Sequence, residues 1–230
     1  MQDQPTQKLQ LILTGATGMV GEGVLHEALQ SDAVEKVLIV NRKPSGISHN
    51  KLKEIIHADF FDLSPIADQL SGYNACFFCL GVSSVGMKEE EFHQKTYVLT
   101  MHAATLLSKL NPQMTFCYIS GASTDSTEKG RLMWARVKGK TENDLMKLPF
   151  KKVYNFRPAV LQPTKGLKNT LKLYHYFGWL IPFVRFISPS SVCTLKELGL
   201  AMINIASKSY DKNILEVKDI VAVAKNRTYP

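Results

Sequence analysis

The sequence predicts an α/β fold: a doubly wound parallel sheet with helices on both faces and a small C-terminal cap region. Three observations predict it. Short apolar runs alternate with segments of helical periodicity along most of the chain. The runs are apolar throughout, as in parallel strands that are buried on both faces. A glycine-rich turn joins the first run to the first helical segment. The 230 residues, 45% of them hydrophobic and 21% charged, fit one such domain.

Six apolar runs have the length of a buried strand: Leu9–Leu13, Lys36–Val40, Leu52–His57, Ala75–Leu80, Thr115–Ile119 and Lys152–Phe156. The segments between them carry helical patterns, at Met19–Ser31, Pro65–Leu70, Lys88–Leu110 and Arg131–Lys147. After Pro158 the pattern loosens into an aromatic-rich segment with several prolines, followed by a helix at Leu195–Ser207 and a short strand near Ile214–Val217. We expect one domain over residues 1–230, in which residues 159–230 form a smaller substrate or partner region.

The turn after the first strand carries three glycines at the spacing G-x-x-G-x-x-G. We expect Gly15 to permit the tight turn and Gly18 to let the backbone approach a pyrophosphate. Gly21 would let the helix pack closely on the strand. The helix N-terminus then offers free N–H groups to phosphates. The alternative is a simple strand–helix turn, but the flanking strand and helix favour dinucleotide binding.

Ligands of such sheets bind outside the carboxyl ends of the strands, so these ends predict the site. The second strand ends in Asn41-Arg42-Lys43, without the acid that NAD-specific sites place there. The Arg42 guanidinium suits a 2′-phosphate, which favours NADP(H), with NAD(H) as the alternative. Otherwise Arg42 is a solvated turn residue.

The next three strand ends also carry candidates. Asp59, beside Phe60, suits a hydrogen bond from the adenine amino group, or else is a turn aspartate. The backbone of Cys79-Leu80-Gly81 would pass near the adenosine ribose. Ser120 and Ser123 follow the fifth strand, where a nicotinamide would lie.

The net charge of +8 indicates either a solvated basic face or attraction to an anionic ligand. No nucleic-acid-binding motif accompanies the charge, so we expect no nucleic-acid partner. The polar N-terminus lacks a signal-peptide pattern, and no run approaches the ~20 apolar residues of a membrane span. We therefore expect a cytoplasmic protein.

Cys76 and Cys79 form a C-x-x-C pair within a strand-like run. Residues three apart in a strand point to opposite faces, so we expect buried structural thiols and not a redox or metal pair. No cluster of His, Cys and acidic residues has metal-ligand spacing, and we expect no metal site.

These residues resemble the atypical short-chain dehydrogenase/reductase superfamily, in particular its NmrA-like and sugar-epimerase-like members. The segment from Thr14 to Gly21 resembles their phosphate loop. The resemblance implies a Rossmann-like NAD(P)-binding domain and a set of cofactor-binding residues. These are Gly15, Thr17, Gly18, Met19, Val20, Gly21, Asn41, Arg42, Asp59, Phe60, Cys79, Leu80, Gly81, Lys138 and Arg157.

The catalytic motif departs from the family pattern. Active members carry Tyr-x-x-x-Lys, in which the tyrosine transfers a proton and the lysine holds the nicotinamide ribose. Here Lys138 is present, but Trp134 stands where the tyrosine belongs. An indole N–H donates a hydrogen bond but cannot shuttle a proton near neutral pH. Either Ser120 or Ser123 would be the partner serine. Other proton donors to consider are Tyr97, His175 and Tyr176.

Two function classes stay open. The first is an oxidoreductase or epimerase-like enzyme that acts on a small-molecule carbonyl or sugar-like substrate with an altered proton donor. The second is a non-catalytic sensor of the NADPH/NADP ratio that binds a protein partner. Both bind the dinucleotide, and both are compatible with a monomer or homodimer.

Overall fold

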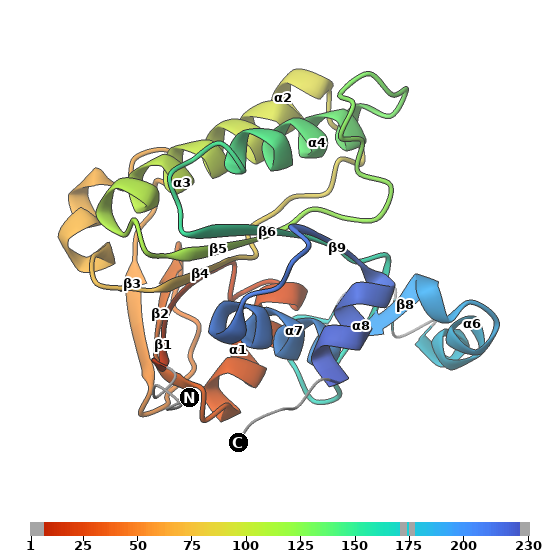
Figure 1. Ribbon diagram of the computed structural model, residues 1–230, viewed down its shortest axis with the longest axis horizontal. Coiled ribbons are helices and arrows are strands. Elements are labelled where there is room, and N and C mark those ends of the chain that lie inside the picture. The colour runs from red at the N-terminus through yellow and green to blue at the C-terminus, as the bar shows by residue number, and fades with distance from the viewer. Residues whose placement is uncertain (1–6, 171–173, 175–177, 226–230) are drawn as a thin grey trace.

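The computed structural model describes residues 7–170, 174 and 178–225. Its centre is a seven-stranded sheet in the order β3-β2-β1-β4-β5-β6-β9, in which every neighbouring pair is parallel (Figure 1). The strands are β1 (Leu9–Thr14), β2 (Val34–Asn41), β3 (Leu52–Ile56), β4 (Ala75–Phe78), β5 (Thr115–Ile119), β6 (Lys152–Arg157) and β9 (Ile214–Glu216). The order reverses between β1 and β4, which places a crevice at their carboxyl ends.

Helices cover both faces of the sheet (Figure 1). One face carries α1 (Met19–Gln30), α7 (Leu195–Lys208) and α8 (Val217–Lys225). The other carries η1 (Ser64–Leu70), α2 (Glu89–His93), η2 (Gln94–Val98), α3 (Leu99–Leu110) and α4 (Met133–Leu145). Alternate strand residues supply two hydrophobic cores: Leu11 and Leu13 face α1, whereas Ile12 faces α3. The predicted doubly wound sheet is confirmed.

The long helix expected at Lys88–Leu110 is continuous from Glu89 to Leu110 but contains a π-helical turn, η2. Such turns insert an extra residue into a helix, and sequence periodicity does not resolve them. The segment expected as a helix at Pro65–Leu70 is a 3₁₀-helix.

The C-terminal third is more closely built into the sheet than the sequence suggests. Strand β9 extends the sheet, and α7 packs against α1 so closely that a Cβ on Gly23 would lie 2.8 Å from Leu195. The sequence pattern did not anticipate α8. It also did not anticipate a two-stranded parallel sheet of β7 (Val160–Gln162) and β8 (Val192–Thr194).

Between β7 and β8, the structure describes η3 (Gly178–Leu180), α6 (Ile181–Ile187) and η4 (Pro189–Ser191). These three elements form a small projection from the body of the molecule. In Figure 1, α6 lies at the right edge, beyond α8 and away from the main sheet.

Cys76 and Cys79 lie on opposite faces of the sheet, as predicted. Cys76 is buried on the α3 face of the sheet, whereas Cys79 packs against the core on the α1 face. Burial raises the pKa of the Cys79 thiol to about 12, which keeps it protonated. Among the described residues, no group of three or more His, Cys, Asp or Glu side chains is placed to hold a metal ion. No helix in the described part of the chain is long and apolar enough to cross a membrane.

Candidate dinucleotide-binding and active site

The β1–α1 turn uses its three glycines in different ways. Gly15 has a φ of +76°, and a Cβ there would lie 2.7 Å from the Cys79 carbonyl oxygen. A Cβ on Gly21 would lie 2.1 Å from the Gly15 carbonyl oxygen, so the helix can approach the turn only because Gly21 has no side chain. Gly18 is different, because its nearest neighbour would be the Gly15 carbonyl oxygen at 3.5 Å. The protein's own packing requires Gly15 and Gly21, whereas Gly18 is exposed and an added Cβ there would make only one ordinary van der Waals contact.

The exposed Gly18 lies at the N-terminus of α1. Gly18 is the N-cap of the helix, and no side chain caps it. The first N–H groups of the helix and the positive end of its dipole therefore suit an anion. Thr17 is exposed beside them, and Met19 and Val20 are half-buried against the core. The cradle fits a pyrophosphate.

A groove of about 270 Å³ gathers residues from three strand ends. Five of the predicted cofactor-binding residues line it: Arg42, Asp59, Phe60, Leu80 and Gly81. They are 39 positions apart along the chain at the extremes, and the parallel sheet brings them together because its carboxyl ends share one edge. The groove is the right kind of cleft for the adenosine half of a dinucleotide.

The polar groups of this groove differ in whether the protein itself already forms hydrogen bonds with them. Arg42 is exposed, and the ring of Phe60 is buried. The Asp59 carboxylate accepts a hydrogen bond from the Phe61 N–H at 2.8 Å through Oδ1. Asp59 therefore has the turn role, and its second oxygen has lone pairs for a further donor.

Sequence reasoning missed an acid beside the end of β2. The buried Asn41 amide donates to Glu54 Oε1 at 2.8 Å, and the Ser45 N–H donates to the same oxygen at 2.9 Å. Glu54 comes from β3, and only strand pairing brings it to Asn41. The Asn41 side chain is therefore bound to β3 and stabilises the end of β2.

Ser120 and Arg157 belong to a buried network around Glu142 of α4. Ser120 Oγ lies 2.5 Å from Glu142 Oε1 and 3.1 Å from the Phe156 carbonyl oxygen. Arg157 donates to both carboxylate oxygens of Glu142, at 3.0 Å and 2.5 Å, and to Ser126 Oγ at 2.6 Å. Glu142 has no exposed surface. The hydroxyl of Ser120 and the guanidinium of Arg157 are both engaged by the protein itself.

Ser123, the other predicted catalytic serine, is exposed. Its φ of +65° is unusual for a residue with a side chain. The neighbouring Thr124 is buried and donates to the Gly121 carbonyl oxygen at 2.7 Å, which stabilises the turn. Strained turns of this kind cluster at functional sites.

Lys138 is the predicted lysine of the catalytic motif. Its ammonium group donates to the Ser120 carbonyl oxygen, and a Cβ on Gly121 would lie 3.9 Å from Nζ. Desolvation lowers the pKa of Lys138 to about 8, against an opposing effect of Glu142. Half-buried Trp134 precedes it by one turn on α4, so both share a helix face.

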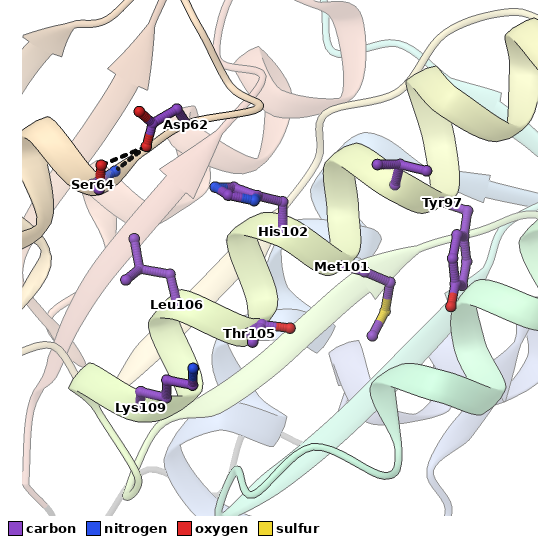
Figure 2. A pocket seen from close by; sticks show the side chains of 9 residues that line it. Asp62, Ser64, Tyr97, Met101, His102, Thr105, Leu106 and Lys109 are labelled. Atoms are coloured by element: carbon purple, nitrogen blue, oxygen red, sulfur yellow. Dashed lines mark hydrogen bonds between the residues drawn. The ribbon is translucent and has the colours of Figure 1, made fainter.

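Tyr97 does not line the groove, and its hydroxyl is bound by the protein itself. Its hydroxyl donates to Asp144 at 2.8 Å, and Lys140 lies over its ring. Figure 2 shows Tyr97, which belongs to η2, among the residues that line a separate cavity of about 480 Å³. The π-helical turn sets the direction of Tyr97. The candidates His175 and Tyr176 lie outside the described residues.

Glu22 of α1 is a second residue that sequence reasoning missed. It is buried and accepts hydrogen bonds from the N–H groups of Lys168 (2.8 Å) and Asn169 (2.7 Å). A glutamate in a first helical turn ordinarily indicates only a favourable dipole interaction. Its partners lie more than 140 positions away, so no local pattern could have revealed this tie between the phosphate turn and the loop after β7.

Several known proteins are similar over most of the chain. Protein FMP52-2, mitochondrial, of Scheffersomyces stipitis is 27% identical over 93% of this chain and 96% of its own length. The Leucinostatins biosynthesis cluster protein T of Purpureocillium lilacinum is 27% identical over 84% of this chain and 83% of its own. Rat Protein HTATIP2 (Rattus norvegicus) is 26% identical over 70% and 66%, respectively.

Solved structures share the fold at low identity. The Bordetella bronchiseptica enzyme WbmG in complex with NAD has a TM-score of 0.66 and 11% identity, covering 97% of this chain and 79% of that one. The UDP-N-acetylglucosamine 4-epimerase of Methanobrevibacter ruminantium M1, in complex with UDP-N-acetylmuramic acid, has a TM-score of 0.61 and 14% identity. That match covers 94% of this chain and 81% of the epimerase. The family model "NAD dependent epimerase/dehydratase family" matches residues 11–130, the half of the chain that holds the phosphate turn and the groove. The chain therefore belongs to the NAD dependent epimerase/dehydratase family, within the atypical short-chain dehydrogenase/reductase superfamily.

Proposed function

We propose that this protein binds NADP(H) and acts as an oxidoreductase or epimerase-like enzyme in which Trp134 replaces the usual catalytic tyrosine. The observation that carries the cofactor half is the groove, where Arg42 and Asp59 meet Leu80 and Gly81 beside the phosphate turn. Preference for the 2′-phosphate rests on Arg42, which is exposed at the end of β2 with Lys43 next to it. The negative charge of Glu54 would repel a 2′-phosphate, but its Oε1 already accepts two hydrogen bonds from Asn41 and Ser45.

The residues around Lys138 can hold and orient ligands. A bound nicotinamide supplies or accepts a hydride. Lys138, with its pKa near 8, is mainly cationic at pH 7 and suits the ribose hydroxyls beside it. The Trp134 indole can donate a hydrogen bond to a carbonyl oxygen but no proton. Ser120 is occupied by Glu142, which leaves exposed Ser123 or water as the nearest proton source.

Trp134 and Ser120 also favour a second candidate function, that of a sensor. Trp134 removes the ordinary acid, and the buried network holds Ser120 away from a substrate. A protein that binds NADP(H) without turnover could sense the NADPH/NADP ratio and report it to a protein partner.

The substrate class rests on the neighbours. The solved structure of WbmG contains NAD and UDP, and the archaeal epimerase contains a UDP-sugar. A small carbonyl or sugar-like substrate is therefore our proposal for this chain. The cytoplasmic location and a monomeric or homodimeric state stay predictions, and the FMP52 proteins carry "mitochondrial" in their names.

The Trp134→Tyr variant distinguishes the proposed enzyme from the proposed sensor. The variant restores a phenol four residues before Lys138, and loss of general acid catalysis typically costs about 10²–10⁴-fold in rate. We expect the native protein to oxidise NADPH slowly with a panel of carbonyl substrates, and Trp134→Tyr to do so measurably faster. Trp134→Phe is the matched control, because it also leaves space but adds no phenol. Rapid turnover by the native protein, lowered in Trp134→Tyr, would refute the assigned role of Trp134. No turnover in either protein, with intact NADPH binding, would favour the sensor.

A further inference from the structure

Four large apolar side chains project from the segment between β7 and β8. Trp179, Phe183, Phe186 and Ile187 are 75%, 63%, 85% and 65% exposed, and we call them the apolar ridge. Soluble proteins tolerate single exposed apolar residues, but a contiguous group of aromatic side chains marks an interaction site. The ridge lies on η3 and α6, at the right edge of the molecule in Figure 1.

The outward direction of the ridge is set by contacts on the other side of α6. Ile181 is buried, and Arg185 donates to Glu197 of α7 at 2.6 Å. These two residues are four apart and face the body of the protein. The ridge residues follow at positions i, i+4, i+7 and i+8 from Trp179, the spacing of a single helix face. The helix is therefore anchored with its apolar face turned away from the core.

The net charge of the chain is concentrated in the same part of the sequence. Residues 145–196 contain nine Lys and Arg and no Asp or Glu, whereas the rest of the chain holds 19 Lys and Arg against 20 Asp and Glu. The net positive charge thus comes from this stretch. Five of its nine cations follow β6, and among these Lys165, Lys168 and Lys196 are exposed. The backbone N–H of Lys168 is held by buried Glu22, which fixes the loop that carries it.

We propose that the apolar ridge docks this protein on the surface of an anionic phospholipid bilayer. Trp179 and the phenylalanines would enter the boundary between headgroups and acyl chains, and the exposed Lys165, Lys168 and Lys196 would meet the lipid phosphates and carboxylates. An apolar helix face together with a basic segment supplies the two signals that stable surface binding needs. The anionic surface is favoured over a second copy of this chain, because two copies joined at the ridge would bring like charges together.

The test uses the full-length protein and vesicles of two compositions. Co-sedimentation compares vesicles of phosphatidylcholine alone with vesicles of equal parts phosphatidylcholine and phosphatidylserine. We expect binding to the anionic vesicles that weakens as salt is raised, and little binding to the neutral ones. Phe183→Ser with Phe186→Ser should lower the partition coefficient by about tenfold or more. The matched control, Val85→Ser with Leu132→Ser, removes exposed apolar side chains elsewhere and should change nothing.

A second pair of variants tests the charge. Lys165→Gln with Lys168→Gln should weaken binding to anionic vesicles several-fold. Lys151→Gln with Lys152→Gln removes the same charge at the start of β6, the opposite edge of the sheet, and should have a smaller effect. In the native protein, acyl chains brominated near the headgroup should quench the Trp179 fluorescence, and Trp179→Phe should lose this quenching. This measurement needs no destabilising substitution.

Three results would overturn the proposal. The first is no binding of the native protein to anionic vesicles at low salt, and the second is equal weakening by the ridge pair and by the control pair. The third is a ridge variant that converts a dimer to a monomer in sedimentation velocity without changing vesicle binding, which would assign the ridge to a second copy. NADPH titration of each variant tests the dinucleotide site separately. A protein that does not bind NADPH would therefore not contradict membrane docking by the ridge.

Discussion

Gly18→Val separates a cofactor cradle from a structural turn. Gly18 has φ −103° and ψ 163°, an extended conformation that valine adopts readily, and the nearest atom to an added Cβ is 3.5 Å away. The valine therefore costs little in the protein itself, about 1 kcal/mol for a poorer helix N-cap. Its methyl groups would fill the space in front of the first N–H groups of α1. A charge-assisted hydrogen bond contributes about 1.5–3 kcal/mol, so losing one should weaken NADPH binding by about ten- to a hundredfold.

Calorimetric titration with NADPH measures this loss, and urea unfolding followed by circular dichroism measures stability. Gly21→Ala is the informative comparison. Its Cβ would lie 2.1 Å from the Gly15 carbonyl oxygen, so α1 must shift and the unfolding midpoint should fall clearly. Gly81→Val, whose Cβ would meet nothing within 4 Å, tests crowding elsewhere in the groove. If Gly18→Val binds NADPH like the native protein, the turn holds no pyrophosphate and the assignment of the cradle fails.

Three further predictions follow from the site. Arg42→Ala should remove most of any preference for NADPH over NADH, about ten- to a hundredfold in affinity, and equal titration curves for both cofactors with the native protein would contradict the role of Arg42. Cofactor affinity should fall as the pH rises through about 8, where folded Lys138 loses its charge, and Lys138→Met should abolish that dependence. The unfolded chain keeps this proton up to about 10.5, so between the two values it binds more protons and the contribution of Lys138 to stability rises with pH. Glu142→Gln should lower the free energy of unfolding by about 3–5 kcal/mol, because it removes the buried charge partner of the Arg157 guanidinium and leaves only the half-exposed Glu216 at 3.4 Å. Glu91→Gln, which breaks an exposed pair with Lys95, should cost less than about 1 kcal/mol in the same denaturant titration, and similar losses for both would show that the buried network is unimportant.

The architecture was predictable because its signals are local. Continuous apolar runs indicate strands buried on both faces, and β1 to β6 lie within a few residues of the expected ranges. The spacing of Gly15, Gly18 and Gly21 predicts a turn of one geometry, and the positive φ of Gly15 agrees with it. The grouping of Arg42, Asp59 and Leu80 in one groove was equally predictable, because a parallel sheet gathers its carboxyl ends on one edge whatever the side chains are.

The sequence did not reveal the contacts that join distant segments. The bond from Glu22 to the backbone at Lys168 and Asn169, the pairing of Asn41 with Glu54, and the burial of Ser120 against Glu142 all depend on how helices and strands pack. The direction of Tyr97 depends on a π-helical turn whose extra residue leaves no mark in the apolar period. The sequence by itself therefore determined the sheet and the glycine turn between β1 and α1. Only the tertiary structure decided which polar side chains are engaged by the protein and which are left for a ligand, because a hydrogen bond between distant segments depends on distance and direction and not on any local pattern.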